Sequence, residues 1–180
     1  AGIPLLCYSI RSAAQSRYID RLIVSTDDPE IKSIGQAEGC IVIDRPANIA
    51  GPEASTESAV LHALDYLKTK NESFDLAVIL EPTSPFRSVE TIDGAINMIV
   101  SRGGHSLLGV RESREVVGIL SEGFFCPLIP DEPRRRQDRC PKYIEASTIY
   151  VCRVEFLRQT EKLACDDWLA YVVPPMETID

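Results

Sequence analysis

Residues 76–88, LAVILEPTSPFRS, combine a short apolar run, two prolines and a helix start in immediate succession. The run 76–80 has the pattern of a strand that is buried on both faces. Pro82 and Pro85 lack the N–H that a central strand must donate, so the strand ends in a rigid turn, and Ser88 is placed as the N-cap of a helix. Polar side chains therefore follow a buried strand, where open α/β sheets bind ligands, although ordinary turn residues would look the same.

The same alternation of strand and helix extends on both sides of this stretch. Further strands are expected at 22–25, 40–43, 106–110, 149–152 and 170–173, and helices at 4–13, 29–37, 55–67, 88–99 and 154–159. This order predicts an α/β fold, a mostly parallel sheet with helices on both faces. A length of 180 residues predicts a single domain, 1–180.

Composition narrows the class of protein. The chain is 44% hydrophobic and 26% charged, as soluble globular proteins are. A formal net charge of −8 disfavours nucleic-acid binding. No apolar run has membrane-spanning length and no secretory signal is present, so no membrane contact and a cytoplasmic setting are expected. The six cysteines include no Cys-x-x-Cys pair, which predicts reduced thiols and argues against a zinc site.

Residues 111–143 break the alternation, because they show no sustained period and contain four prolines. An irregular stretch of this length is usually a lid or an interaction element. The basic run 134–136 is open to three interpretations. It is a solvated loop, it neutralises an anionic substrate, or it pairs with acidic residues of a second subunit. Phe124, Phe125, Leu128 and Ile129 form an apolar group, which predicts a two-fold homodimer through this segment.

Three charged residues follow predicted strands. Asp27 and Asp28 come after the strand at 22–25, where carboxylates bind Mg²⁺ or position a nucleotide. Asp28 also precedes Pro29 and is expected to cap the next helix, whereas Asp27 is open to either role. Arg45 follows the strand at 40–43 and offers a rigid donor fork for a phosphate or a base carbonyl, although a surface arginine has the same signature.

Together these segments resemble the CMP-N-acetylneuraminate synthetase family, bacterial cytidylyltransferases that activate sialic-acid-like sugars. The signature at 81–87, EPTSPFR, is similar to the family's Gln-Pro-Thr-Ser-Pro-Leu-Arg. The remaining matches occur in family order: AGIPLL at 1–6, VSTDD at 24–28, RPANIA at 45–50 with Ser55 and Thr56, and Arg136-Gln137 with Tyr143 before Ile149-Tyr150.

The resemblance implies a nucleotide-sugar transferase fold (GT-A/Rossmann-like) with a dimerisation and sugar-site insertion at 111–147. It also implies that CTP and an acidic nine-carbon 2-keto sugar give a CMP-sugar and pyrophosphate with Mg²⁺. The nucleotide would contact Arg45, Ser55, Thr56 and Asp27. The sugar would contact Glu81, Thr83, Ser84, Arg136, Gln137 and Tyr143. Catalytic roles would fall to Arg87, which orients the sugar or its loop, and to Asp180, the metal ligand.

The sequence departs from the family pattern in three places. The family's N-terminal triphosphate loop would precede Ala1, and the second aspartate of its metal pair would follow Asp180, so we expect a chain truncated at both ends. Glu81 replaces a glutamine, and Ala146-Ser147 replaces Asn-Gly. The sugar therefore stays open among sialic, legionaminic, pseudaminic and octulosonic (KDO) acids. Two rival interpretations are a non-catalytic nucleotide-binding module and a receiver-like domain. A receiver-like domain would need a lysine on a late strand-end loop, and this sequence offers no good candidate.

Overall fold

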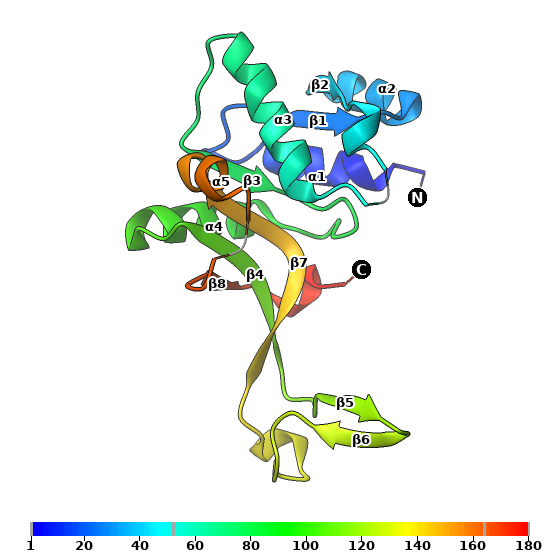
Figure 1. Cartoon of the computed structure of the whole chain (residues 1–180), viewed down its shortest axis with the longest axis vertical. Coiled ribbons are helices and arrows are strands. Elements are labelled where there is room, and N and C mark those ends of the chain that lie inside the picture. The colour runs from blue at the N-terminus through cyan, green and yellow to red at the C-terminus, as the bar shows by residue number, and fades with distance from the viewer. Residues whose placement is uncertain (1, 52, 164, 180) are drawn as a thin grey trace.

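The computed structural model describes residues 2–51, 53–163 and 165–179. Figure 1 shows a body of helices and strands from which a thin β-arm projects. The α-helices are α1 (Leu5–Ala13), α2 (Pro29–Ala37), α3 (Thr56–Thr69), α4 (Val89–Arg102) and α5 (Val154–Thr160). Short 3-10 turns lie at Ala47–Ile49, Arg136–Asp138 and Pro175–Glu177.

The strands of the body form two sheets. β1 (Ile23–Thr26) pairs in parallel with β2 (Ile41–Asp44). The second sheet has the order β3-β7-β4-β8 and contains β3 (Leu76–Ile79), β7 (Lys142–Arg153), β4 (Ser106–Ser113) and β8 (Leu169–Val172). In it β4 and β8 are parallel, but β7 runs antiparallel to both of its neighbours.

The predicted mostly parallel sheet is therefore wrong, and the sheet is mixed. The chain leaves the body along β4 and returns along β7, so the returning strand must run against the outgoing one. An apolar run specifies that a strand is buried but not the direction in which it runs, which is why the sequence did not reveal β7 as antiparallel.

Helices do cover both faces of the four-stranded sheet. On one face α4 packs Ile92 and Ile99 against Leu107 and Val151. On the other face Cys152, the next residue of β7, packs with residues of α3 and α5. Adjacent strand residues point to opposite faces, so this division between two clusters places a helical layer on each side.

The helix starts follow the capping residues expected from the sequence. Asp28, Ser55 and Ser88 are the N-caps of α2, α3 and α4, and each side chain accepts main-chain N–H bonds from the first turn. Each such cap stabilises its helix by about 1 kcal/mol. The caps matter for function because they fix where α2, α3 and α4 begin, beside the ends of the strands.

The arm contains more regular structure than the sequence predicted. β4 continues to Ser113, β7 begins at Lys142, and between them β5 (Gly118–Ser121) and β6 (Phe124–Pro127) form an antiparallel hairpin. Its side chains are exposed, with Leu120 80% and Phe124 73% accessible. A strand exposed on both faces has no buried side to impose an apolar alternation, so the pattern that identifies half-buried strands is missing here.

Two further properties concern the whole described chain. Among its residues, no helix combines the length and the apolar character needed to cross a bilayer. All six cysteines are free thiols, as the sequence predicted. Burial raises the pKa of the Cys152 thiol to about 12, which makes it a packing residue rather than a nucleophile.

Candidate functional site

A cavity of about 680 Å³ extends between β1 and β3 and reaches the ends of both strands. Six residues that the sequence singled out line it: Asp27, Asp28, Arg45, Ser55, Thr56 and Glu81. They come from four separate segments, the ends of β1, β2 and β3 and the start of α3. The fold thus brings together polar groups that lie up to 54 positions apart in the sequence.

The two adjacent aspartates after β1 have different roles. The Asp28 carboxylate accepts hydrogen bonds from the N–H groups of Glu30 (2.8 Å) and Ile31 (2.9 Å) and so caps α2. Asp28 in turn donates its own N–H to the hydroxyl of buried Thr26, at 3.1 Å. Both aspartates are exposed and line the cavity, but only Asp28 has a capping role. Asp28 is therefore structural, and Asp27 remains the candidate for ligand binding.

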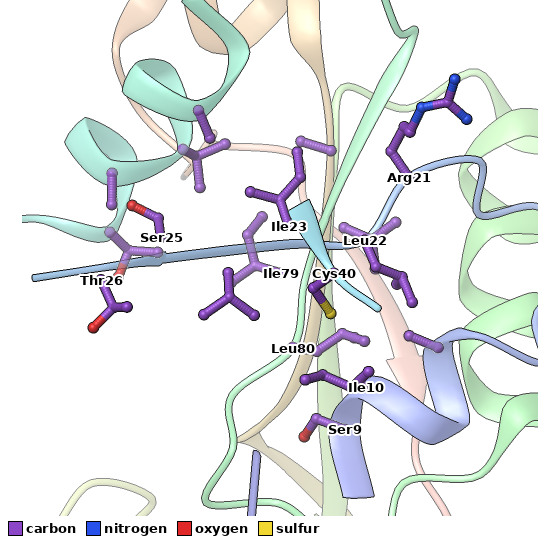
Figure 2. A pocket seen from close by; sticks show the side chains of 18 of the residues that line it. Ser9, Ile10, Arg21, Leu22, Ile23, Ser25, Thr26, Cys40, Ile79 and Leu80 are labelled. Carbon is purple, nitrogen blue, oxygen red and sulfur yellow. The ribbon is translucent and has the colours of Figure 1, made fainter. Parts of the chain in front are cut away.

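Arg45 is half-buried at the end of β2 and reaches across to β1. Its guanidinium donates to the main-chain carbonyl of Ser25 and, at 3.3 Å, to the Ser25 hydroxyl. These bonds hold the Arg45 guanidinium against Ser25 of β1, two residues before Asp27. Figure 2 shows the Ser25 and Thr26 side chains at this end of the cavity, with Arg21 and Leu22 at the other.

Ser55 and Thr56 lie at the start of α3 and are both exposed. The Ser55 hydroxyl accepts from the N–H of Ser58 at 3.1 Å, so its first role is that of a helix cap. The N-terminus of a helix of this length carries partial positive charge, which favours an anion beside it. The start of α3 is thus the part of the cavity wall best suited to a phosphate or a carbonyl oxygen.

Arg87 is the centre of the turn that carries Glu81. It is 3% exposed, and its guanidinium donates to the carbonyl of Thr148, to the Ser9 hydroxyl (3.2 Å) and to the Glu81 carbonyl (2.9 Å). Burial lowers the pKa of Arg87 to about 10, and Glu177 and Glu81 oppose this shift. The group stays charged at neutral pH and joins β7, α1 and the turn.

This placement bears on the role predicted for Arg87. Its donors are occupied by protein oxygens, and it does not line the cavity. The geometry corresponds to orienting the loop, the second of the two roles expected from the sequence. Direct action on a substrate would require the network to open, so we treat Arg87 as a positioning residue.

The two residues at the centre of the turn also differ. Thr83 is exposed but does not line the cavity. Ser84 is completely buried, and its N–H donates to the Glu81 carbonyl at 3.2 Å. The predicted contact between Ser84 and a sugar is therefore unavailable in this conformation, because a short side chain in the interior cannot reach a ligand in the cavity.

Arg136, Gln137 and Tyr143 do not join the cavity. They lie on the arm, apart from the body (Figure 1). Arg136 and Gln137 are exposed, and Tyr143 lines a separate apolar hollow of about 320 Å³ with Leu128 and Ile129. Within one chain, the structure separates the predicted sugar-site residues of the arm from those of the strand ends.

The sequence did not single out Glu145 as a partner of Tyr150. The Tyr150 hydroxyl donates to the Glu145 carboxylate, and burial together with this bond raises the Tyr150 pKa to about 12. Tyr150 lies opposite Ile79 in the β3–β7 ladder, and Ile79 is two residues before Glu81. The ladder therefore brings Tyr150 close to the start of the Glu81 turn. Only the register of that ladder could have shown this proximity, and strand register is not legible in separate apolar runs.

The described residues include no group of three or more His, Cys, Asp or Glu that could hold a metal ion. Asp180, the predicted ligand, lies outside the described residues. The cavity does contain two carboxylates, Asp27 and Glu81. Mg²⁺ is typically held by one or two carboxylates together with substrate phosphates, so this donor set fits a metal that arrives with a nucleotide and does not fit an all-protein cage.

Comparison with known proteins places this geometry in context. The family model described as cytidylyltransferase matches residues 1–118. The chain is 38% identical over 95 residues to an N-acylneuraminate cytidylyltransferase of Escherichia coli O18:K1:H7, covering 53% of this chain and 22% of that protein. It is 32% identical over 99 residues to a CMP-N,N'-diacetyllegionaminic acid synthase of Legionella pneumophila, covering 54% and 43%.

A solved structure agrees with the fold. It is that of a CMP:2-keto-3-deoxy-manno-octonic acid synthetase complexed with CTP, with a TM-score of 0.65 at 14% identity, covering 96% of this chain and 80% of that one. At this identity the likeness concerns the fold alone. The chain spans less than half the length of the two curated relatives described above.

Proposed function

Because this chain belongs to the cytidylyltransferase family, we propose that the protein transfers a cytidylyl group from CTP to an acidic sugar of the sialic-acid type. The observation that carries the proposal is the cavity, in which Asp27, Arg45, Ser55, Thr56 and Glu81 converge from four segments. Relatives that act on sialic-acid-like sugars support it.

The proposed reaction is an in-line displacement at phosphorus. A hydroxyl oxygen of the sugar attacks the α-phosphorus of CTP, a new O–P bond forms, the bond between the α- and β-phosphates breaks, and pyrophosphate leaves. The hydroxyl proton passes to solvent or to a carboxylate of the site. Such a reaction needs no covalent intermediate, so the protein contributes positioning and electrostatic stabilisation.

The residues of the cavity divide this work by their chemistry. The fork of Arg45 suits a cytosine carbonyl or a phosphate, beside the positive end of α3 at Ser55 and Thr56. Glu81 accepts hydrogen bonds from sugar hydroxyl groups when ionised. Arg87 keeps the Glu81 turn in place through the Glu81 carbonyl.

A magnesium ion is part of the proposal. When bound, it would neutralise the phosphates and the departing pyrophosphate. Asp27 and Glu81 would hold it from within the described structure, together with Asp180.

The acceptor sugar and the assembly are also proposals. Glu81 and the Ala146–Ser147 pair depart from the family pattern near the expected sugar contacts, so sialic, legionaminic, pseudaminic and octulosonic acids stay candidates. The arm residues Arg136, Gln137 and Tyr143 lie away from the cavity of their own chain. A homodimer through the exposed arm, in the cytoplasm, is the arrangement we propose.

The test uses the adjacent pair Asp27 and Asp28 in the full-length protein. With Mg²⁺, we expect Asp27→Asn and Asp180→Asn each to lower pyrophosphate release about 100-fold, on the scale of losing one principal electrostatic contact. CTP should bind far more tightly than ATP or GTP in calorimetry, and both variants should keep metal-free CTP affinity. The readouts are a coupled pyrophosphate assay and titration calorimetry.

Asp28→Asn is the matched control. It removes the same charge one residue away, and asparagine caps a helix about as well as aspartate. Its turnover and stability should stay close to wild type. Equal affinity for all three nucleotides would remove the proposed base recognition, and normal turnover of both Asp27→Asn and Asp180→Asn would remove the proposed metal site.

A further inference from the structure

Glu177 is a buried acidic residue that does not line the 680 Å³ cavity. It ends the 3-10 turn Pro175–Glu177, which follows β8, and it is 7% exposed. Its Oε2 atom is buried and accepts no hydrogen bond from the residues that the structure describes. A glutamate is almost never buried this deeply without an opposite charge nearby. Its surroundings should therefore contain a cation.

Arg87 is that cation. Its guanidinium is also buried, and the three acceptors described above, on Thr148, Ser9 and Glu81, are carbonyl and hydroxyl oxygens without charge. Neutral acceptors satisfy the donors of Arg87 but do not balance a buried positive charge. Burial lowers the pKa of Arg87, and the charge of Glu177 opposes this shift more strongly than that of Glu81 does. Glu177 is thus the stronger counter-charge of the network, and it acts through space.

The sheet explains why the two side chains come close. A Cβ atom placed on Gly109 of β4 would lie 3.1 Å from the side chain of Val173 and 3.2 Å from that of Ile149, so these two residues meet over the glycine. Thr148, the neighbour of Ile149 in β7, accepts the Nε bond of Arg87. The chain that leaves β8 at Val173 therefore passes the part of β7 to which Arg87 is bonded.

The helix α4 supplies a second point of reference. Arg87 directly precedes Ser88, the N-cap of α4. A Cβ atom on Gly94 of α4 would lie 2.3 Å from the hydroxyl of Tyr171, so β8 contacts this helix there. Burial and, after it, the charge of Glu177 raise the pKa of Tyr171. Glu177 acts on residues at both places and so lies beside the first turns of α4, where the helix dipole favours a carboxylate.

The turn that carries Glu177 is fixed by its own hydrogen bonds. The Glu177 N–H donates to the Pro174 carbonyl at 2.9 Å, and the Thr178 N–H and hydroxyl both donate to the Pro175 carbonyl, at 3.3 and 2.9 Å. Figure 1 shows this turn in the body, where the β4–β7 ribbon leaves for the arm. Asp180 follows Glu177 by three residues, which span at most about 11 Å. An anchor at Glu177 therefore restricts where Asp180 can be.

We propose that Glu177 is a positioning residue of the cytidylyl-transfer site. Its buried carboxylate anchors the segment that leads to Asp180 to the same guanidinium, that of Arg87, which holds the Glu81 turn. Arg87 would then restrain both Glu81 and Asp180, two of the carboxylates assigned to Mg²⁺ above. The catalytic consequence rests on the proposed function, whereas the anchoring does not.

The first test measures metal affinity in the full-length protein with CTP and without an acceptor sugar, so that no turnover occurs. Glu177→Gln keeps the size of the side chain and removes its charge. We expect Mn²⁺, a paramagnetic substitute for Mg²⁺, to bind about 10-fold more weakly to the CTP complex, the lower limit for losing a group that orients a metal ligand. CTP affinity without metal should keep its wild-type value, because Arg45 and the start of α3 are untouched. Electron paramagnetic resonance gives the Mn²⁺ affinity and titration calorimetry the CTP affinity.

Two further variants separate charge from packing. Glu155→Gln removes the same charge from an exposed residue of α5 and should bind Mn²⁺ as the wild type does. Glu177→Asp keeps the charge on a shorter side chain and should recover most of the lost affinity. If Glu177→Asp binds Mn²⁺ as weakly as Glu177→Gln, the side chain acts by filling space, and positioning through its charge is wrong.

The second test observes Arg87 itself and needs no ligand. A buried arginine side chain gives its own Nε–H signal in heteronuclear NMR spectra, and Arg87→Lys identifies that signal by removing it. The Nε proton of Arg87 donates to the Thr148 carbonyl and is shielded from water. In Glu177→Gln, which lacks the counter-charge, this signal should shift and its proton should exchange at least about 10-fold faster. Glu155→Gln should change neither property.

The two tests distinguish this inference from the proposed function. If the wild type neither binds CTP nor releases pyrophosphate, yet the Arg87 signal responds to Glu177→Gln, the proposed function is wrong and the anchoring stands. If the wild type is an active cytidylyltransferase but Glu177→Gln binds Mn²⁺ normally, the positioning role is wrong. An Arg87 signal that is identical in Glu177→Gln and Glu155→Gln would overturn the anchoring itself.

Discussion

Arg87 and Arg139 each hold a proline-rich loop through three oxygen acceptors, one in the body and one in the arm. Arg87 donates to Thr148, Ser9 and Glu81 and is 3% exposed. Arg139 donates to the carbonyls of Pro133 (2.8 Å), Arg134 (2.9 Å) and Arg114 (3.1 Å), and it is only half-buried.

The contrast shows that the same guanidinium chemistry has different consequences in the two regions. The acceptors of Arg87 lie on α1, β7 and the Glu81 turn, so the residue connects elements far apart in sequence. The acceptors of Arg139 lie within 25 positions of it and all belong to the arm, so it connects only segments of the arm. In the interior, oxygens that lose their donor cannot turn to water, whereas those of the arm can.

The largest effect is therefore expected from Arg87→Ala. We expect it to lower the free energy of unfolding by about 3–5 kcal/mol, the range for breaking a buried charged network. Arg87→Lys keeps the charge but cannot reproduce the planar fork, so it should recover only part of this loss. Arg139→Ala, the matched change in the arm, should cost about 1 kcal/mol. Urea denaturation followed by circular dichroism measures all three.

The comparison would fail if Arg87→Ala and Arg139→Ala cost the same. In a variant that still folds, Arg87→Lys should lower kcat more than CTP affinity, because it disturbs the Glu81 turn and leaves Arg45 and the start of α3 intact. A uniform loss of CTP binding would instead indicate that the whole cavity had been disturbed.

A smaller effect, confined to association, is expected from the arm. Phe124→Asp places a charge in its exposed apolar surface, where Phe124 is 73% accessible. If that surface forms the dimer, the dissociation constant should rise at least about 10-fold, the equivalent of about 1.4 kcal/mol, while thermal stability at low concentration changes little. Sedimentation velocity gives the constant.

Val100→Asp is the matched control, on an exposed apolar residue of α4 in the body, 57% accessible. Its dissociation constant should equal that of the wild type. A wild-type protein that stays monomeric at micromolar concentration would contradict the dimer itself.

The body and the arm also differ in how well the sequence predicted them. Helix starts at Asp28, Ser55 and Ser88 were confirmed, because a cap is a local event that needs only a hydroxyl or carboxylate before an apolar face. The resemblance to CMP-N-acetylneuraminate synthetases was confirmed by N-acylneuraminate relatives. Both kinds of inference rest on short stretches whose meaning does not depend on distant residues.

What failed depends on pairing between distant segments. The direction of β7, the hairpin of the arm and the bond between Tyr150 and Glu145 are all consequences of strand register. The position of Arg87 belongs to the same class, since burial could not be inferred from a charged residue in a turn. The sequence identified the polar residues at the strand ends that line one cavity, but it could not show which of their side chains face the cavity.

The smallest effect concerns Ser147, where the β4–β7 ribbon shifts its register between the body and the arm. The β4–β7 ladder is irregular between Leu108 and Val110, and Ser147 on the facing strand has φ of 46°. Left-handed backbone costs a residue with a Cβ about 1–2 kcal/mol, which glycine avoids. Glycine loses part of this gain because its unfolded chain is more flexible, by about 0.4–1 kcal/mol.

Ser147 also hydrogen-bonds to Tyr150, so Ser147→Gly and Ser147→Ala must be compared, since both remove that hydroxyl. We expect the glycine variant to be about 0.5–1 kcal/mol more stable than the alanine variant, measured by thermal denaturation of both proteins in the same buffer. An alanine variant as stable as the glycine variant would show that the strain is relieved by a shift of the ribbon, and that the junction between body and arm is not held at one register.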